Sequence, residues 1–211
     1  IIDGGWLLRQ CSFVSGESYG TIIEKYVRFV KERGKQTMVI FDGYNSSPKD
    51  HDHQRRSKDY SATLVLHLGT PCTTSKARFM ANSRNKSQLI TLLSDALQAN
   101  GVDVLIENDD ADTAIVREGL SQSQEHDVEI RVEDTDVVCL FVHHCFAADN
   151  ELFLTTSEGS YNIKKIRNSL PEKELKYLLF SHSFSGCDTV SSIYGLGTVS
   201  YTHLRAHETR E

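Results

Sequence analysis

The 211-residue chain has no apolar run that approaches the roughly 18 to 20 residues of a membrane-spanning helix. It also lacks a secretory signal pattern, an internal repeat and a low-complexity segment. Its five cysteines do not have the paired spacing of zinc sites, and their number is odd. We therefore expect reduced, mostly buried thiols in an intracellular protein, nuclear or cytoplasmic, that does not enter membranes.

An excess of positive charge is lacking too, since the formal net charge is −6. This balance argues against a protein that binds polyanions with its whole surface. The segment 49–86 is the exception, because it contains eight basic and three acidic residues, whereas the rest of the chain carries a net −11. Such asymmetry suits a basic arm beside an acidic pocket.

The hydrophobic pattern predicts an α/β protein. We expect helices at four places: 19–33, 86–100, 110–120 and 171–182. We expect strands at 37–41, 102–106 and 128–132, and a hairpin formed by 151–156 and 160–163. Alternation of strand and helix through the first 140 residues predicts a mostly parallel central sheet flanked by helices on both faces, in a Rossmann-like three-layer arrangement. The segment 137–142 fits either a short helix or a strand.

Two stretches fit this pattern less well. Residues 1–5 resemble the end of a strand that runs into a glycine turn, and Gly4-Gly5 is too short to be a phosphate loop. From residue 44 to 85 the regular pattern lapses. Compact domains seldom contain so long an irregular connection unless it is a functional lid or a disordered segment. We expect a helix or strand within it, around residues 62–68.

Aspartates mark the ends or starts of these elements. Asp3, Asp42 and Asp134 each follow an apolar run at the carboxyl edge of the expected sheet, where α/β proteins bind ligands. Asp136 lies two residues beyond Asp134, and a further aspartate of interest, Asp188, comes late in the chain. The expected helix at 110–120 begins with two more aspartates, Asp110 and Asp112. Singly, each has an equally good interpretation as a helix cap or a turn residue.

Together, seven carboxylates at matching points of the topology require a cation, because like charges repel. Hard oxygen ligands select Mg²⁺ or Mn²⁺. Two such ions, roughly 3.5 to 4 Å apart, would suit phosphodiester hydrolysis, since they activate water and stabilise the charge on the phosphate. In this interpretation the catalytic residues are Asp3, Asp42, Asp134 and Asp136.

The order of these motifs resembles the flap endonuclease-like nucleases of the PIN-like superfamily. The motifs that carry the resemblance are Ile2-Asp3, Ile40-Phe41-Asp42-Gly43, Asp110-Ala111-Asp112, Glu133-Asp134-Thr135-Asp136 and Gly186-Cys187-Asp188-Thr189. The resemblance implies a PIN-like nuclease domain over residues 1–197, with residues 185–197 as the start of a helix-hairpin element that grips duplex DNA. It also implies seven metal ligands: Asp3, Asp42, Asp110, Asp112, Asp134, Asp136 and Asp188.

The same resemblance gives the basic segment a role. Residues 44–85 would form an arch or gateway, and cations there and just beyond would steer a strand of DNA or RNA toward the metals. The candidate phosphate-binding residues are Arg55, Arg56, Lys76, Arg78, Arg84 and Lys86. The chain departs from the family where Asp110-Ala111-Asp112 replaces the usual Glu-x-Glu pair, which shortens the reach of both carboxylates.

Two other functions are compatible with the pattern. Asp134-Thr135-Asp136-Val137 fits the nucleophile motif of haloacid dehalogenase-type phosphatases, although that motif normally comes early in a chain. A catalytically inactive PIN-like module that binds nucleic acid or protein is the other. Residues 199–211 resemble a translated sequencing-adapter remnant, so we treat 198–211 as a non-native tail and expect the nuclease domain at 1–197 to be truncated at both ends relative to the natural protein.

Overall fold

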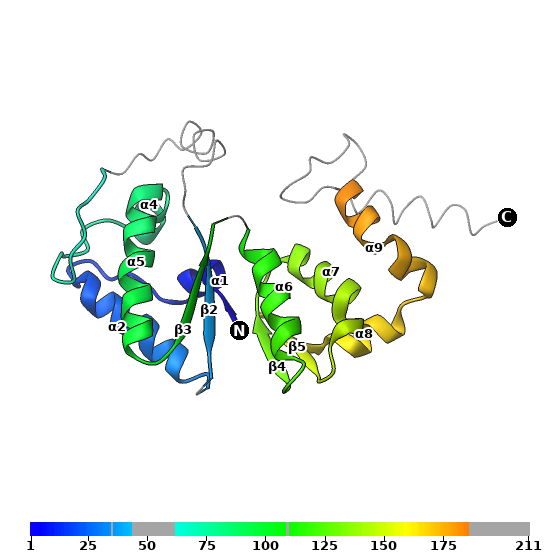
Figure 1. Ribbon diagram of the computed structural model, residues 1–211. Coiled ribbons are helices and arrows are strands. Elements are labelled where there is room, and N and C mark those ends of the chain that lie inside the picture. The colour runs from blue at the N-terminus through cyan, green and yellow to red at the C-terminus, as the bar shows by residue number, and fades with distance from the viewer. Residues whose placement is uncertain (35, 44–61, 109, 186–211) are drawn as a thin grey trace. The chain divides into compact units, whose positions relative to one another are not determined.

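The computed structural model describes residues 1–34, 36–43, 62–108 and 110–185 (Figure 1). Contacts divide the chain into two compact units, Ile1–Ala114 and Ile115–Glu211, and each is described by itself. Among the described residues, no helix is long and apolar enough to cross a lipid bilayer. Several predicted features lie outside the described residues: the part of the arch at 44–61 with Arg55 and Arg56, the motif at Asp188, nearly all of the helix-hairpin element and the tail.

Three parallel strands form the sheet of the first unit. They are β1 (Ile2–Asp3), β2 (Met38–Asp42) and β3 (Asp103–Glu107), with β2 in the middle. Ile2 pairs with Val39, and Ile40 pairs with Leu105. The predicted strands at 37–41 and 102–106 are confirmed to within one residue. The carboxyl ends of β1 and β2 therefore lie side by side at one edge.

Four helices of the described first unit accompany these strands. They are α1 (Gly4–Gln10), α2 (Tyr19–Lys31), α4 (Lys76–Met80) and α5 (Ser83–Ala99). Helix α2 packs against α5, and apolar residues at helical spacing on both are fully buried in the core. The hydroxyl group of the buried Tyr26 donates a hydrogen bond to the carbonyl of Leu8, 2.8 Å away, which ties α2 to α1. The predicted helices at 19–33 and 86–100 are confirmed.

The expected glycine turn at residues 4 and 5 is wrong, because α1 begins there. The Asp3 carboxylate accepts hydrogen bonds from the backbone N–H groups of Gly5 (2.9 Å) and Trp6 (2.8 Å) and so caps the helix. Gly4 is required by close packing, since a Cβ there would lie 2.2 Å from Cδ1 of Phe41 and 2.8 Å from the carbonyl oxygen of Ile40. The absence of a side chain at Gly4 thus lets the start of α1 lie directly against β2.

The expected helix or strand around 62–68 is also wrong. That segment has neither, and side chains of α5 satisfy its backbone groups instead. The buried Asn85 accepts from the N–H of Leu64 (2.8 Å) and donates to the carbonyl of Ala62 (3.1 Å). The side chain of Gln88 accepts a hydrogen bond from the N–H of Leu66 and donates one to the carbonyl of Leu64. The described part of 44–85 contains the short helix α4 and the first residues of α5.

The second unit contains β4 (Val128–Arg131) and β5 (Leu152–Thr155), which are parallel, and β6 (Ser160–Asn162), which is antiparallel to β5. The predicted hairpin is therefore confirmed. In both units the described strands are parallel except β6, so the α/β class with mostly parallel strands is confirmed as well.

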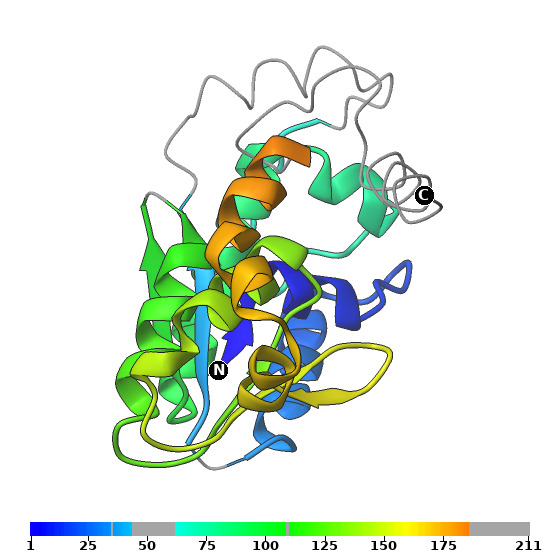
Figure 2. The ribbon, with the colours of Figure 1, turned by 90° about the vertical axis from the view of Figure 1, so that its right-hand side faces the viewer.

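Helices of the second unit are α6 (Ala111–Gln122), α7 (Thr135–His144), the 3₁₀ turn η1 (Cys145–Ala147), α8 (Ile163–Ser169) and α9 (Glu172–Ser185). Both α8 and α9 pack against α7, and Figure 2 shows the three together. The ambiguous segment 137–142 is helical, because Asp134 caps α7. Helix α8 was not predicted, and it is capped by Asn162, which accepts from the N–H of Lys165 (3.0 Å).

Candidate metal centre

Asp3 and Asp42 end the adjacent parallel strands β1 and β2. Burial raises the pKa of the Asp3 carboxyl above its ordinary value, and the negative charge of Asp42 acts in the same direction. Hydrogen bonds from the N–H groups of Trp6 and Gly5 and the charge of Arg9 oppose this increase without cancelling it. The first unit therefore keeps a carboxylate where its charged form is disfavoured, which is common at functional sites.

The start of α6 receives two of the predicted carboxylates. Asp42 accepts a hydrogen bond from the N–H of Ala111 (3.0 Å), and Asp110 accepts one from the N–H of Asp112 (3.2 Å). These backbone groups would otherwise lack partners at a helix start, and the positive end of the helix dipole favours negative charge there. Asp42, at the end of a strand, and Asp110, at the start of a helix, are thus both held by the first turn of α6.

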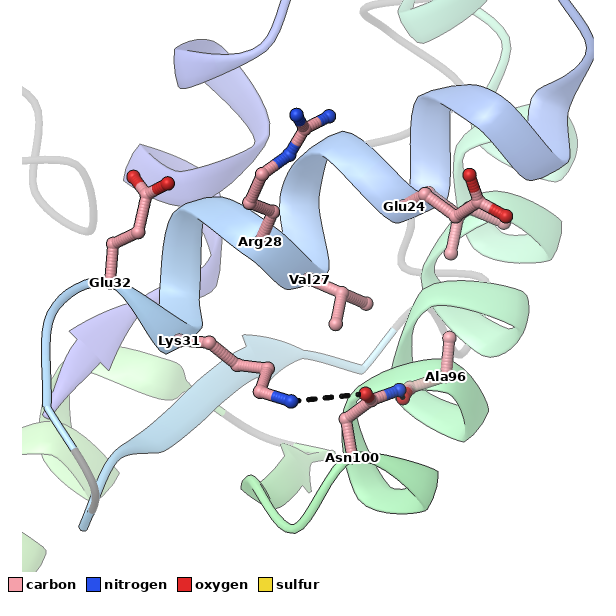
Figure 3. Close-up of a pocket in the computed structure, with 8 residues that line it drawn as sticks. Glu24, Val27, Arg28, Lys31, Glu32, Ala96 and Asn100 are labelled. Atoms are coloured by element: carbon pink, nitrogen blue, oxygen red, sulfur yellow. Dashed lines mark hydrogen bonds between the residues drawn. The ribbon is translucent and has the colours of Figure 1, made fainter.

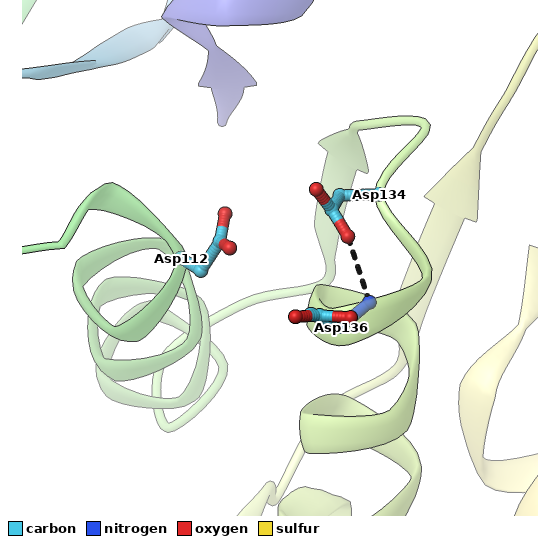
Figure 4. A group of neighbouring side chains, drawn as sticks. All are labelled: Asp112, Asp134 and Asp136. Atoms are coloured by element: carbon cyan, nitrogen blue, oxygen red, sulfur yellow. Dashed lines mark hydrogen bonds between the residues drawn. The ribbon is translucent and has the colours of Figure 1, made fainter. Parts of the chain in front are cut away.

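Asp112 belongs to a group of three carboxylates with Asp134 and Asp136 (Figure 4). One oxygen from each of these half-buried side chains lies within 4.8 Å of the other two. In Figure 4, Asp112 projects from α6 toward the two aspartates at the start of α7. The boundary between the two units falls inside α6, so Asp112 is on the same continuous helix as residues of the second unit.

Close packing of α6 on α7 holds this group together. A Cβ at Gly119 of α6 would lie 2.7 Å from Cζ of the buried Phe141 of α7 and 3.8 Å from Cγ1 of Ile130 in β4. Glycine therefore allows the helices to approach closely. On α7, the N–H of Asp136 donates to Oδ1 of Asp134 (2.8 Å), which fixes the Asp134 carboxylate as the helix cap.

A fourth side chain, His182 of α9, was missed by sequence reasoning. Its Nε2 lies 2.7 Å from Oδ1 of Asp136, and the two side chains are only 20% and 19% exposed. No local motif surrounds His182, which the sequence pattern marks simply as the end of a helix. The one available signal is its position six residues before Asp188 in the last recognised motif.

The predicted basic residues have different environments. Lys76 is half-buried and donates from Nζ to the carbonyl oxygens of Arg9 (3.0 Å) and Cys11 (2.6 Å), and burial lowers the pKa of its amine. It therefore holds the end of α1 in this structure. Three others are on α4 and α5: Arg78 and Arg84, which are exposed, and Lys86, which is half-buried.

Each unit has a cavity whose lining residues are all described. The first, about 480 Å³, is between α2 and α5, and its charged rim mixes Glu24, Arg28, Lys31 and Glu32 (Figure 3). Lys31 donates to the side-chain oxygen of Asn100, 3.5 Å away. None of the predicted site residues lines this cavity. Its mixed charge does not select an anionic or a cationic ligand.

The second cavity, about 490 Å³, lies beside α8 and α9. Its charged lining has one acid, Glu172, and three cations, Arg167, Lys173 and Lys176, and the exposed rings of Phe146 and Tyr177 also line it. The Arg167 guanidinium lies 5.5 Å from the centre of the Phe146 ring, and the Lys176 amine lies 5.5 Å from that of Tyr177. Exposed aromatic faces beside cations are suited to bases and phosphates.

No family model, curated protein or solved structure matches this chain. The function must therefore be argued from the carboxylate group. The group consists of oxygen donors alone, which suits a hard divalent cation such as Mg²⁺ or Mn²⁺. Ligand oxygens at roughly 2.1 Å from a Mg²⁺ ion are at most about 4.2 Å apart. The 4.8 Å limit of the group is close to that span, so small side-chain rotations or one bridging water would complete the fit.

Proposed function

We propose that this chain is a divalent-metal-dependent nuclease of the flap endonuclease-like, PIN-like type, acting on DNA or RNA. The observation that carries the proposal is the convergence of Asp112, Asp134 and Asp136, which come from two helices and are separated by up to 24 positions in the sequence. Carboxylates this close repel one another, and a bound cation would reduce the repulsion. The three-layer PIN-like fold with an arch at 44–85 is part of the same proposal.

In this function Asp112, Asp134 and Asp136 would hold one ion, with Asp3, Asp42, Asp110 and Asp188 completing the ligand set. The bound ions would supply an activated water and neutralise the charge that develops on the phosphate. The chain contributes rigidity, because Asp3 and Asp134 are fixed as helix caps and Asp42 by the N–H of Ala111. The raised pKa of Asp3 is consistent with this role, because a bound cation would stabilise the charged form of the carboxyl group.

Nucleic acid as substrate is supported by the distribution of cations in the second unit. Five of the seven Lys and Arg residues in 115–185 lie between Lys164 and Lys176, beside the aromatic cavity. Phosphates would bind the amines, and bases would stack on Phe146 and Tyr177. The predicted arch residues would add to this surface.

The test is cleavage of fluorescent flap, single-stranded and RNA substrates in Mg²⁺, Mn²⁺ or EDTA. Asp134→Asn removes a ligand charge, yet asparagine caps a helix as well as aspartate does, so α7 should persist. We expect this variant to lose cleavage while its substrate affinity stays within about twofold. The matched control is Asp103→Asn, which removes an exposed carboxylate from β3 and should cleave normally.

Equal cleavage by wild type and Asp134→Asn would refute the proposal. Cleavage in EDTA would refute the metal requirement. The Asp-x-Asp pair after β4 also suits a phosphatase, so p-nitrophenyl phosphate is included as a substrate. Its hydrolysis, with no cleavage of nucleic acid, would establish phosphatase activity instead. Metal and nucleic-acid binding without any hydrolysis would establish the inactive binding module.

A further inference from the structure

His182 has no part in the metal-ligand set described above, although it contacts one member of that set. The imidazole comes from the last turn of α9, which packs against α7, and approaches Asp136 at the first turn of α7. The 2.7 Å separation of Nε2 and Oδ1 is short for a nitrogen–oxygen hydrogen bond, as expected when the acceptor is a carboxylate. About four-fifths of each side chain is shielded from solvent.

The geometry defines what Nε2 can do. A carboxylate oxygen is an acceptor, so Nε2 must carry a proton and act as the donor. A protonated ring nitrogen has no lone pair to offer a metal, so in this arrangement Nε2 is not a ligand. The hydrogen bond engages Oδ1 of Asp136. It also restricts rotation of the carboxylate about its last torsion angle, which is otherwise broad.

The contact extends a short chain of hydrogen bonds. His182 holds the side chain of Asp136, and the backbone N–H of Asp136 holds the carboxylate of Asp134. Two of the three clustered carboxylates are thereby oriented before any ion arrives. Groups that orient metal ligands in this way commonly change metal affinity by 10- to 100-fold when removed.

We propose that His182 is a positioning residue of the metal centre, which orients Asp136 through Nε2 and so sets the affinity for the divalent ion. The inference rests on the proposed function, because it assigns a role within that site. Helix α9 thereby acts on the site through a contact that spans 46 positions in the sequence. His182 itself touches neither the substrate nor the ion.

The experiment compares His182→Ala and His182→Gln in the full chain. Glutamine can present its side-chain N–H₂ to Asp136, whereas alanine removes the donor. Mn²⁺ binding is measured by electron paramagnetic resonance of the unbound ion, and cleavage is measured as a function of Mn²⁺ concentration. We expect His182→Ala to weaken Mn²⁺ binding, and to raise the Mn²⁺ concentration for half-maximal cleavage, by about 10- to 100-fold. His182→Gln should keep most of the Mn²⁺ affinity of the wild type. In both variants KM for the oligonucleotide should stay within about twofold of the wild-type value.

His126→Ala serves as the control, because His126 is exposed in the same unit. Thermal unfolding in EDTA shows whether each variant is folded. If wild type binds Mn²⁺ and cleaves, and His182→Ala does both equally well, the positioning role is wrong while the nuclease stands. Equal losses in the alanine and glutamine variants would also overturn it. If wild type neither binds Mn²⁺ nor cleaves, the nuclease proposal itself fails.

Discussion

The two glycines that open α1 give a sharp test of the packing that places Asp3. In Gly4→Ala the new methyl group would meet the ring of Phe41 at 2.2 Å and the backbone oxygen of Ile40 at 2.8 Å. Phe41 is only 1% exposed and Ile40 belongs to the central strand β2, so neither can move aside easily. In Gly5→Ala the nearest atom is an Asp3 carboxylate oxygen at 3.4 Å, an ordinary contact.

The two substitutions should change the free energy of unfolding in opposite directions. Overpacking costs about 1–3 kcal/mol, and a clash with backbone belongs at the upper end of that range. Alanine recovers about 0.5–1 kcal/mol relative to glycine in a helix. The free energy of unfolding should therefore fall by about 1–2.5 kcal/mol in Gly4→Ala and rise by up to about 1 kcal/mol in Gly5→Ala. At about 2–4 °C per kcal/mol for a chain of this size, Tm should fall by about 2–10 °C in the first variant and rise by up to about 4 °C in the second.

The assay is thermal unfolding of wild type and both variants, followed by circular dichroism in EDTA so that metal binding does not contribute. Both substitutions change the same residue type in the same helical turn, so their difference isolates the close approach of α1 to β2. A Gly4→Ala protein that melts at or above the temperature of Gly5→Ala would refute the reasoning.

Two further predictions concern charge. Burial raises the pKa of the Asp3 carboxyl above 3.8, so the folded protein holds the proton of this carboxyl more tightly than the unfolded chain does. Ionisation of Asp3 therefore lowers the free energy of unfolding as pH rises above 3.8. In EDTA, Asp3→Asn should therefore gain stability relative to wild type as pH rises above 3.8, the ordinary pKa of the carboxyl group. A Tm difference that stays constant with pH would contradict this. Replacing Lys173 and Lys176 with alanine should weaken single-stranded DNA binding and reduce the salt slope, log Kd against log salt, by about 1.4. Fluorescence anisotropy measures this, Lys31→Ala is the control from the other cavity, and an unchanged slope would refute a role for these amines.

Periodic hydrophobic patterns in the sequence determined much of the fold. Helix α2 follows from Ile22, Ile23, Tyr26 and Val27 at helical spacing, because a helix needs one apolar face to bury. Strand β2 follows from a continuous apolar run, which suits a strand in the middle of a sheet. These signals are local, so they can be read within a window of about a dozen residues.

The sequence predicted one group of seven aspartates, and among the described residues three of them form a group: Asp112, Asp134 and Asp136. Asp42 and Asp134 were expected at strand ends, and the structure places Asp42 against the start of α6 and Asp134 beside Asp136 and Asp112. That aspartates follow the strands is predictable, because an apolar run that ends in an acid marks the carboxyl end of a strand, where α/β proteins bind ligands. That the group binds a metal and cleaves nucleic acid stays a prediction.

Tertiary structure decided the features that depend on partners far along the chain. Helix α1 begins at a glycine only because Asp3 caps it and Phe41 leaves no room for a larger residue. Lys76 was expected to bind phosphate, yet it donates to carbonyls 65 and 67 positions away. His182 reaches Asp136 across 46 positions. Such contacts depend on how helices and strands pack in three dimensions, and no local pattern in the sequence encodes that packing.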